Sequence, residues 1–300
     1  MKKQSNTRYA YFSHVGKVRM NNEDNLYCGG TFIAPEMQGD AFLASGEAIP
    51  PCVFAVCDGM GGQECGEFAS LAAASALSEL EESIKTAPPG KIDGLVQQYV
   101  QKANSIICDK MREKSARIGT TLALVVITNE DIRPYNIGDS RIYDFSNGKL
   151  RQISEDHTLA GQKVNMGIIT KEQARHDRDR NKLTRYLGIF EDEMVMEAEP
   201  LPALSLNEPR RLLLCSDGLT DLVEDEKIKE ILQSALISEA AEILVNTALE
   251  NGGKDNVTCI VIDVGNDAEN TTIQEVTMRD AKPMGRFSRI FNELLCRKGE

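Results

Sequence analysis

Short runs of β-branched, aromatic and other apolar residues recur along the chain, and each run predicts a β-strand. The predicted strands are Arg8–Val15, Asn25–Ile33, Cys52–Cys57, Thr120–Thr128, Ile132–Ile137, Arg141–Phe145, Lys149–Ile153, Glu193–Ala198, Arg210–Cys215 and Asn256–Val264. The dipeptide Asn147-Gly148 separates two of these runs, which indicates a two-residue hairpin.

Apolar residues at helical spacing predict two consecutive pairs of helices. The first pair is Gly66–Lys85 and Ile92–Lys114, and Pro88-Pro89-Gly90 ends its first helix. The second pair is Asp225–Ala235 and Glu239–Asn251. Strands in clusters with paired helices do not suggest a parallel βαβ sheet. They indicate an α+β fold in which helix pairs cover antiparallel sheets.

One hydrophobic unit extends from about residue 8 to 264, so residues 1–264 are predicted to form a single domain. Within it, residues 156–183 are polar and charged and are predicted to form a mobile excursion. Residues 265–300 are predicted to be a polar linker followed by a basic, amphipathic C-terminal tail.

The charge of the chain narrows the possible functions. It has 300 residues with 34 basic and 46 acidic side chains, so its formal net charge is −12. This charge repels a phosphate backbone, and we therefore expect no binding to nucleic acid. An acidic protein that acts on an anionic substrate needs a local source of positive charge, such as a bound metal ion.

The compartment is predicted from what the sequence lacks. It has no apolar run of about 18 residues, and its first residues lack the apolar stretch of a signal peptide, so we expect a cytoplasmic protein. The eight cysteines are scattered and form no CxxC pair, which favours reduced thiols over a disulfide framework.

An apolar strand that ends in Asp-Gly occurs twice. The strand Cys52–Cys57 leads into Asp58-Gly59, and the strand that ends at Cys215 leads into Ser216 and then Asp217-Gly218. A buried strand would hold each aspartate rigidly at a sheet end, and glycine permits a close approach of the backbone to a ligand. An ordinary Asp-Gly turn is the alternative for either copy taken alone.

Further acids flank other predicted strands. They are Glu23, Asp24, Asp139 and Asp255. Such a set of carboxylates suits hard cations, Mg²⁺ or Mn²⁺, which prefer oxygen ligands. The sequence does not favour a zinc site, because His14, His157 and His176 are far apart and do not have the spacing of zinc ligands.

Several phosphate-handling mechanisms are excluded. The chain has no Gly-x4-Gly-Lys-Ser/Thr loop and no Gly-x-Ser-x-Gly elbow. No cysteine has the arginine six positions later that a cysteine-dependent phosphatase needs, and Asp177-Arg-Asp179 lies in a charged stretch rather than at a strand end. Metal-assisted hydrolysis without a protein nucleophile remains.

Eight short strings occur in a characteristic order, and together they resemble the metal-dependent protein serine/threonine phosphatases of type 2C, the PPM family, in its bacterial branch. The strings are RMNNEDN (19–25), VCDGMGG (56–62), GTT (119–121), NIGDSR (136–141), EDHT (155–158), LTRYLG (183–188), LCSDGLTD (214–221) and GGKDNVT (252–258). The resemblance covers roughly residues 8–264 and implies a four-layer α-β-β-α sandwich of two antiparallel sheets.

The resemblance also implies a centre of two Mn²⁺ or Mg²⁺ ions, with room for a third, at which a metal-activated water hydrolyses phosphoserine or phosphothreonine in proteins. The implied metal-binding residues are Asp58 as the bridge, the Gly59 carbonyl, Asp217 and Asp255, with Glu23 and Asp24 holding metal-bound waters and Asp139, Asp217 and Asp221 at the third site. Arg19 matches the arginine that grips the substrate phosphate.

Two residues leave the source of the leaving-group proton open. Met60 stands where eukaryotic relatives often carry histidine, and methionine cannot donate a proton. His157 is the one histidine in a family string, and we interpret it as structural, at a helix start. Residues 159–182 match the variable flap of the family, and the basic residues Arg175 to Arg180 are predicted to form a solvated face.

The resemblance implies phosphorylated proteins as partners, among them a membrane-anchored Ser/Thr kinase and its targets, and we expect a monomer. An inactive module that binds phosphoproteins and an enzyme for another phosphoester remain as alternatives. The segment Phe287–Lys298 has one apolar helical face flanked by basic residues. It either belongs to a simple tail or contacts an anionic membrane or a partner.

Overall fold

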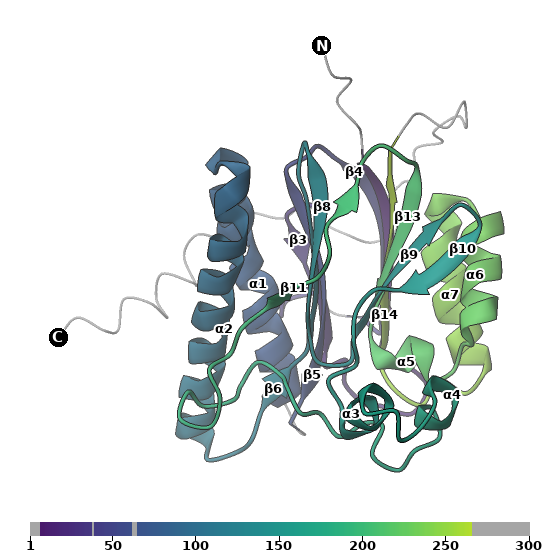
Figure 1. Ribbon diagram of the computed structural model, residues 1–300. Coiled ribbons are helices and arrows are strands. Elements are labelled where there is room, and N and C mark those ends of the chain that lie inside the picture. Colours follow the sequence, from purple (N-terminus) through teal and green to yellow (C-terminus); the bar gives the residue numbers. More distant parts are fainter. Residues whose placement is uncertain (1–6, 38, 62–64, 266–300) are drawn as a thin grey trace. The chain divides into compact units, whose positions relative to one another are not determined.

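Two antiparallel sheets lie face to face in the unit Met1–Asp267, and pairs of helices cover their outer faces (Figure 1). The computed structural model describes residues 7–37, 39–61 and 65–265. The predicted tail 265–300 lies outside these residues from position 266 onward. The α+β class and the order of layers agree with the prediction.

The first sheet has six strands in the order β10-β9-β13-β14-β1-β4. Their bounds are β10 Lys149–Gln152, β9 Arg141–Ser146, β13 Arg210–Cys215, β14 Val257–Val264, β1 Thr7–His14 and β4 Ala41–Ala48. The predicted hairpin between β9 and β10 is confirmed. Asn147 and Gly148 form its two-residue loop with φ of 51° and 71°, the left-handed region that this turn requires.

The second sheet has the order β11-β8-β7-β5-β2-β3, with β12 paired to β8 and β6 to β5. Its strands are β11 Glu199–Pro200, β8 Asp131–Ile137, β7 Leu122–Ile127, β5 Cys52–Met60, β2 Asp24–Cys28, β3 Thr31–Phe32, β12 Leu204–Ser205 and β6 Gly119–Thr120. The predicted strand 25–33 is divided by Gly29 and Gly30, whose positive φ angles turn the chain between β2 and β3.

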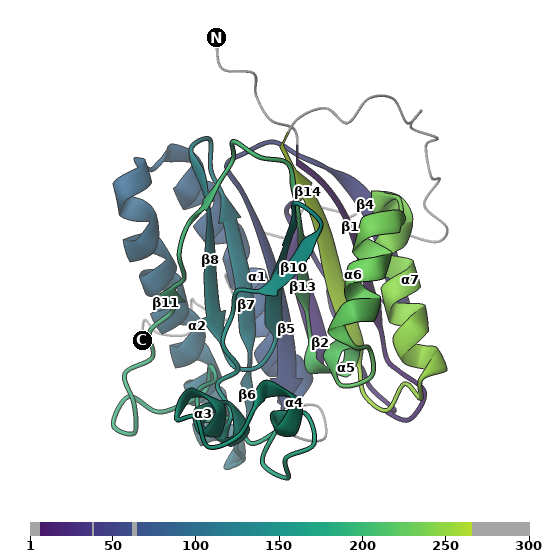
Figure 2. The ribbon, with the colours of Figure 1, turned by 45° about the vertical axis from the view of Figure 1, so that its right-hand side comes forward.

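Helices α1 (Cys65–Thr86) and α2 (Ile92–Lys114) pack on the second sheet, and α6 (Asp225–Ser234) and α7 (Ile237–Glu250) pack on the first (Figure 2). The shorter helices are η1 Pro89–Lys91, α3 Leu159–Asn165, α4 Lys171–Ala174 and α5 Asp217–Thr220. Within the described part of the chain, no helix combines the length and the apolar composition needed to span a membrane.

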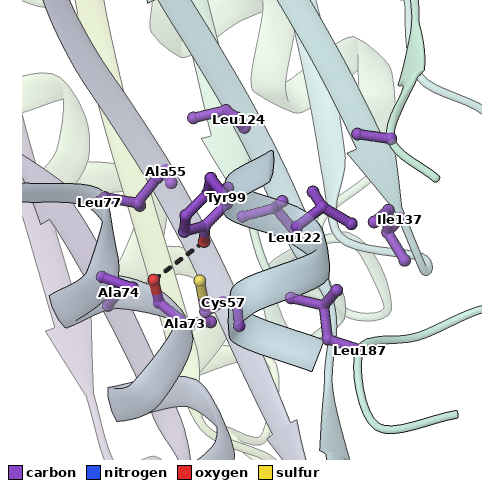
Figure 3. Close-up of a cluster of buried hydrophobic side chains, with 14 of the residues drawn as sticks. Ala55, Cys57, Ala73, Ala74, Leu77, Tyr99, Leu122, Leu124, Ile137 and Leu187 are labelled. Carbon is purple, nitrogen blue, oxygen red and sulfur yellow. Dashed lines mark hydrogen bonds between the residues drawn. The ribbon is translucent and has the colours of Figure 1, made fainter. Parts of the chain in front are cut away.

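The central strands β5, β7 and β14 are apolar on both sides because they are covered on both faces. In β5, Val53 and Ala55 point toward α1 and α2, whereas Phe54 and Val56 point into the layer between the sheets. Figure 3 shows the helix-side layer, in which the hydroxyl of Tyr99 donates a hydrogen bond of 2.9 Å to the carbonyl of Ala73. The seven cysteines among the described residues are free thiols.

Three local expectations differ from the structure. Residues 193–198 form no strand, because their backbone bonds to the side chain of Gln97 on α2. Nε2 of Gln97 donates to the carbonyl of Met196 at 2.9 Å, and Oε1 accepts from the amide of Ala198 at 3.2 Å. The excursion 156–183 contains two helices, α3 and α4, whose N-termini are capped by Thr158 and Thr170. The edge strand β4 was not predicted, because its sequence, AFLASGEA, has few β-forming residues and takes its register from β1.

Candidate functional site

Acidic residues from both sheets meet at one end of the sandwich. Asp24 and Asp58 are cross-strand neighbours on β2 and β5 of the second sheet. Asp217 follows β13, and Asp255 precedes the adjacent antiparallel strand β14, so these two flank the same end of the first sheet. This end is the lower one in Figure 2, where β5 ends near α5.

Asp58 is held by hydrogen bonds to its backbone on both sides. Its amide donates to Oγ1 of Thr121 at 2.9 Å, and its carbonyl accepts from the amide of Thr121, also at 2.9 Å. Strand β5 continues past Asp58, because Gly59 and Met60 pair with β6. The alternative of an ordinary Asp-Gly turn is therefore wrong here. At the second copy, Asp217-Gly218 opens helix α5 and is not a simple turn either.

Both glycines of the Asp-Gly pairs are needed because other backbone segments approach them closely. A Cβ on Gly59 would lie 2.3 Å from the carbonyl oxygen of Gly66 and 2.5 Å from that of Glu23. A Cβ on Gly218 would lie 2.0 Å from the carbonyl oxygen of Asn256. The glycines thus bring the acidic segments together, in addition to any approach to a ligand.

Asp24 joins the two sheets. Its side chain is 4% exposed, and its Oδ2 accepts a 2.8 Å hydrogen bond from the hydroxyl of Ser216. That hydroxyl in turn accepts from the amide of Thr258 on β14, at 3.0 Å. Burial, together with the nearby charges of Asp217 and Asp255, raises the pKa of Asp24 to about 7.

Three further carboxylates of the site, those of Asp58, Asp139 and Asp217, have raised pKa values for the same physical reasons. Burial is the largest cause for Asp58 and Asp139, whose pKa values lie well above the ordinary range, and neighbouring aspartates raise them further. The pKa of Asp217 rises to about 7 through burial and the charges of Asp221 and Asp255. So many acids at one place need protons or bound cations to offset their repulsion.

Arg19 lies at the rim of this cluster, where its side chain is 51% exposed. Its Nη2 donates to Oδ2 of Asp255 at 2.7 Å, and this hydrogen bond raises the pKa of the guanidinium. Burial raises the pKa of Glu23, which follows in the same loop, and Arg19 opposes that shift. The structure therefore brings the predicted phosphate-binding arginine beside a predicted metal ligand.

Asp139 and Asp221 line a cavity of about 460 Å³ together with Asp217. The loop before Asp139 is fastened by His157, whose Nδ1 accepts from the amide of Gly138 at 3.1 Å while its own amide donates to the Gly138 carbonyl at 3.0 Å. This agrees with the structural interpretation of His157, which immediately precedes the N-cap of α3.

The flap contacts the same cavity through its basic residues. Arg175 is only 18% exposed; it donates to the carbonyl of Thr220 at 2.8 Å and pairs with Glu224 at 3.2 Å. The prediction of a solvated face is therefore wrong for Arg175. It holds for Arg178, which is 90% exposed, and Arg180 reaches Asp221 at 3.5 Å.

The arrangement can supply oxygen ligands from several loops at once. Nevertheless, in residues 7–37, 39–61 and 65–265 no three acidic, histidine or cysteine side chains converge closely enough to form a ready metal cluster. The individual ligand roles of Asp58, Gly59, Asp217 and Asp255, and those of the surrounding acids, therefore stay predictions. Sequence reasoning missed the supporting residues Thr121, Ser216 and Asn256, although each lies inside a family string.

Comparisons with known proteins agree with this geometry. A family model described as protein phosphatase 2C matches residues 36–251. The serine/threonine protein phosphatase PstP of Mycobacterium tuberculosis is 36% identical over 262 residues, which are 86% of this chain and 45% of that protein. The chain therefore spans less than half the length of this curated relative.

Two further similarities extend over nearly the whole of the other chain. The serine/threonine phosphatase stp of Listeria monocytogenes is 32% identical over 252 residues, which are 83% of this chain and 92% of that protein. The crystal structure of the catalytic domain of PstP in complex with two manganese ions is 34% identical with a TM-score of 0.71. It covers 87% of this chain and 100% of that chain.

We predict that Gly59→Ala destabilises the protein, by about 1–3 kcal/mol, because the new methyl group meets two backbone carbonyls that cannot move independently. Urea unfolding measures this loss. Gly94→Ala is the matched control, because a Cβ at this position in α2 has nothing within 4 Å, and alanine is the better helix former. Equal stability of the two variants would contradict the close packing at Gly59.

We also predict a pH dependence of stability in the metal-free protein. The pKa values of Asp24 and Asp217 in the folded protein are raised to about 7, so protonation of these two carboxyl groups favours the folded state. Their contribution to stability is therefore fully present below their ordinary pKa values. It is lost as the pH rises through about 7. The free energy of unfolding in EDTA should therefore be lower at about pH 8 than at about pH 5.

Asp217→Asn removes one of these charges and should raise the stability of the metal-free protein at about pH 8 by roughly 1–3 kcal/mol, a value kept modest because the side chain is only partly buried. Urea unfolding of both proteins at the two pH values measures the effect, with the exposed Asp192→Asn as the control. An identical pH slope for wild type and Asp217→Asn would refute the prediction.

Proposed function

Because the chain belongs to the protein phosphatase 2C family, we propose that it hydrolyses phosphoserine and phosphothreonine in proteins, with Mn²⁺ or Mg²⁺ as its cofactor. The observation that carries the proposal is the meeting of Asp24, Asp58, Asp217 and Asp255 at one end of the two sheets, with Arg19 at its rim. A cationic ligand and an anionic substrate group complement these two features.

The residues present fit a pair of hard cations. Every candidate ligand is an oxygen, and burial and mutual repulsion raise the pKa values of Asp24, Asp58 and Asp217, so bound cations would offset that repulsion. Asp58, the Gly59 carbonyl, Asp217 and Asp255 would hold the ions, and Asp139 with Asp221 would complete a third position. Bound divalent cations supply Lewis acidity that activates water and offsets the charge of a phosphate group.

The surrounding residues orient these groups. Asp24 is fixed by Ser216, and Glu23 follows Arg19 in one loop; by the family resemblance, both acids would hold the waters bound to the ions. The guanidinium of Arg19 can donate two parallel hydrogen bonds to phosphate oxygens, which a lysine cannot do. Its half-exposed position allows it to exchange Asp255 for the substrate.

The leaving alkoxide needs a proton, and the chain places no acidic group at position 60. Met60 is partly buried and packs against the apolar layer under α1 and α2. Water is therefore the proposed proton source. We assign His157 a structural role, because its Nδ1 accepts a hydrogen bond from the amide of Gly138 and so fastens the loop before Asp139.

The proposed substrates are phosphoproteins, and the proposed opposing enzyme is a bacterial Ser/Thr kinase. The names of the relatives support the first statement, since PstP and stp are both called serine/threonine phosphatases. We propose a cytoplasmic location in line with such substrates.

The test of the proposal is phosphate release from a phosphothreonine peptide with Mn²⁺, with Mg²⁺ or with EDTA. Activity should require the metal and should be abolished in Asp58→Ala and in Asp217→Ala, whereas Asp192→Ala, an exposed acid, should keep it. If the folded wild-type protein releases no phosphate with any metal, the reaction class is wrong. Binding of the same peptide without turnover would then identify a phosphoprotein-binding module.

Arg19→Ala should mainly raise KM, by roughly 10- to 100-fold, because it removes charge-assisted hydrogen bonds to the substrate phosphate. Steady-state kinetics with the phosphothreonine peptide measure this change. Arg178→Ala is the control, since Arg178 is 90% exposed. A large fall in kcat at unchanged KM would show that the role of Arg19 is wrongly assigned.

A further inference from the structure

The loop formed by residues 15–23, which we call the Arg19 loop, connects β1 to β2 and has no regular secondary structure. It carries Arg19 and Glu23, two of the residues on which the proposed function depends. Because a loop has no hydrogen-bond ladder of its own, the positions of these side chains depend on what holds its backbone.

Asn256 holds both ends of the Arg19 loop with one buried side chain. Its Oδ1 accepts from the amide of Glu23 at 2.8 Å, while its Nδ2 donates to the carbonyls of Val15 at 2.8 Å and Asn21 at 2.9 Å. The residue is 5% exposed. These partners fix the orientation of the amide, because a backbone amide only donates and a carbonyl only accepts.

The same residue connects the loop to the acids. The backbone amide of Asn256 donates to Oδ1 of Asp255 at 2.9 Å, and the other oxygen of that carboxylate accepts from Arg19 at 2.7 Å. Glu23 is also bonded on its other side, because its carbonyl accepts a hydrogen bond from the amide of Gly59 at 3.1 Å. Hydrogen bonds therefore connect Asn256 to Arg19 through Asp255, and to Gly59 through Glu23.

We propose that Asn256 is a positioning residue for phosphate recognition, acting through Arg19 and Glu23 without touching the substrate. The proposal rests on the proposed function. Other bonds also attach the Arg19 loop, since Lys17 donates to the carbonyl of Gly253 at 2.7 Å and Asn22 donates to the hydroxyl of Ser13 at 2.9 Å. Loss of the Asn256 amide should therefore loosen the loop and leave the domain folded.

Asn104 provides a matched control. It is also a buried asparagine that holds a loop, with its Oδ1 accepting from the amide of Gly188 at 2.7 Å and its Nδ2 donating to the carbonyl of Ile189 at 2.9 Å. Asn104→Ala and Asn256→Ala should both lower the thermal midpoint. Only Asn256→Ala should raise KM for a phosphothreonine peptide, by about 10-fold or more, with a smaller change in kcat. An unchanged KM would overturn the proposal.

A double-mutant cycle tests whether Asn256 acts through Arg19. If it does, Asn256→Ala should lower kcat/KM much less in the Arg19→Ala protein than in the wild type, because the group to be positioned is already absent. Multiplicative losses in kcat/KM would show independent effects and would contradict the proposed route.

Hydrogen exchange of the Mn²⁺-loaded protein followed by mass spectrometry gives a readout that does not require activity. Asn256→Ala should exchange faster in residues 15–24 and remain unchanged in residues 187–190, and Asn104→Ala should show the reverse. Unchanged exchange in residues 15–24 would refute the positioning role. Absence of turnover in the wild type would instead refute the proposed function. The exchange data would still decide independently whether Asn256 holds the Arg19 loop.

Discussion

The repulsion among carboxylates at one end of the sandwich is the constraint on which the rest of the site depends. Asp24, Asp58 and Asp217 all have raised pKa values, chiefly because they are partly or fully removed from water. A fold relaxes such a cluster by moving the acids apart unless their backbones are fixed. Here the backbones are fixed by strand pairing and by neutral donors, so the charge remains available for cations.

Neutral side chains do most of this fixing. Ser216 bonds Asp24 across the gap between the sheets, Thr121 binds the amide of Asp58, and Asn256 ties the Arg19 loop to β14. None of these three bears a charge, so they add order without altering the balance of repulsion. The glycines at 59 and 218 contribute in another way, because they let neighbouring backbones approach.

The acidic residues could be predicted from the sequence because their signal is local. An apolar run followed by Asp-Gly marks a buried strand that leads to the acidic cluster, and the structure places both copies at the same end of the sandwich. The partners of Asn256 could not be predicted, because Val15 and Glu23 lie more than 230 positions away along the chain. The absent strand at 193–198 has a similar cause, since Gln97 on a distant helix takes its hydrogen bonds.

The acids come from two different sheets, and this origin makes the apolar layer between the sheets a spacer for the site. Asp24 and Asp58 extend from the second sheet, whereas Asp217 and Asp255 extend from the first. Phe54 and Ile260, buried between the sheets, help to set how far apart those pairs lie. Changes in side-chain volume in this layer should therefore alter the separation of the two pairs of acids, although none of the acids lies in the layer. The packing of the core is thus part of the geometry of the acidic cluster.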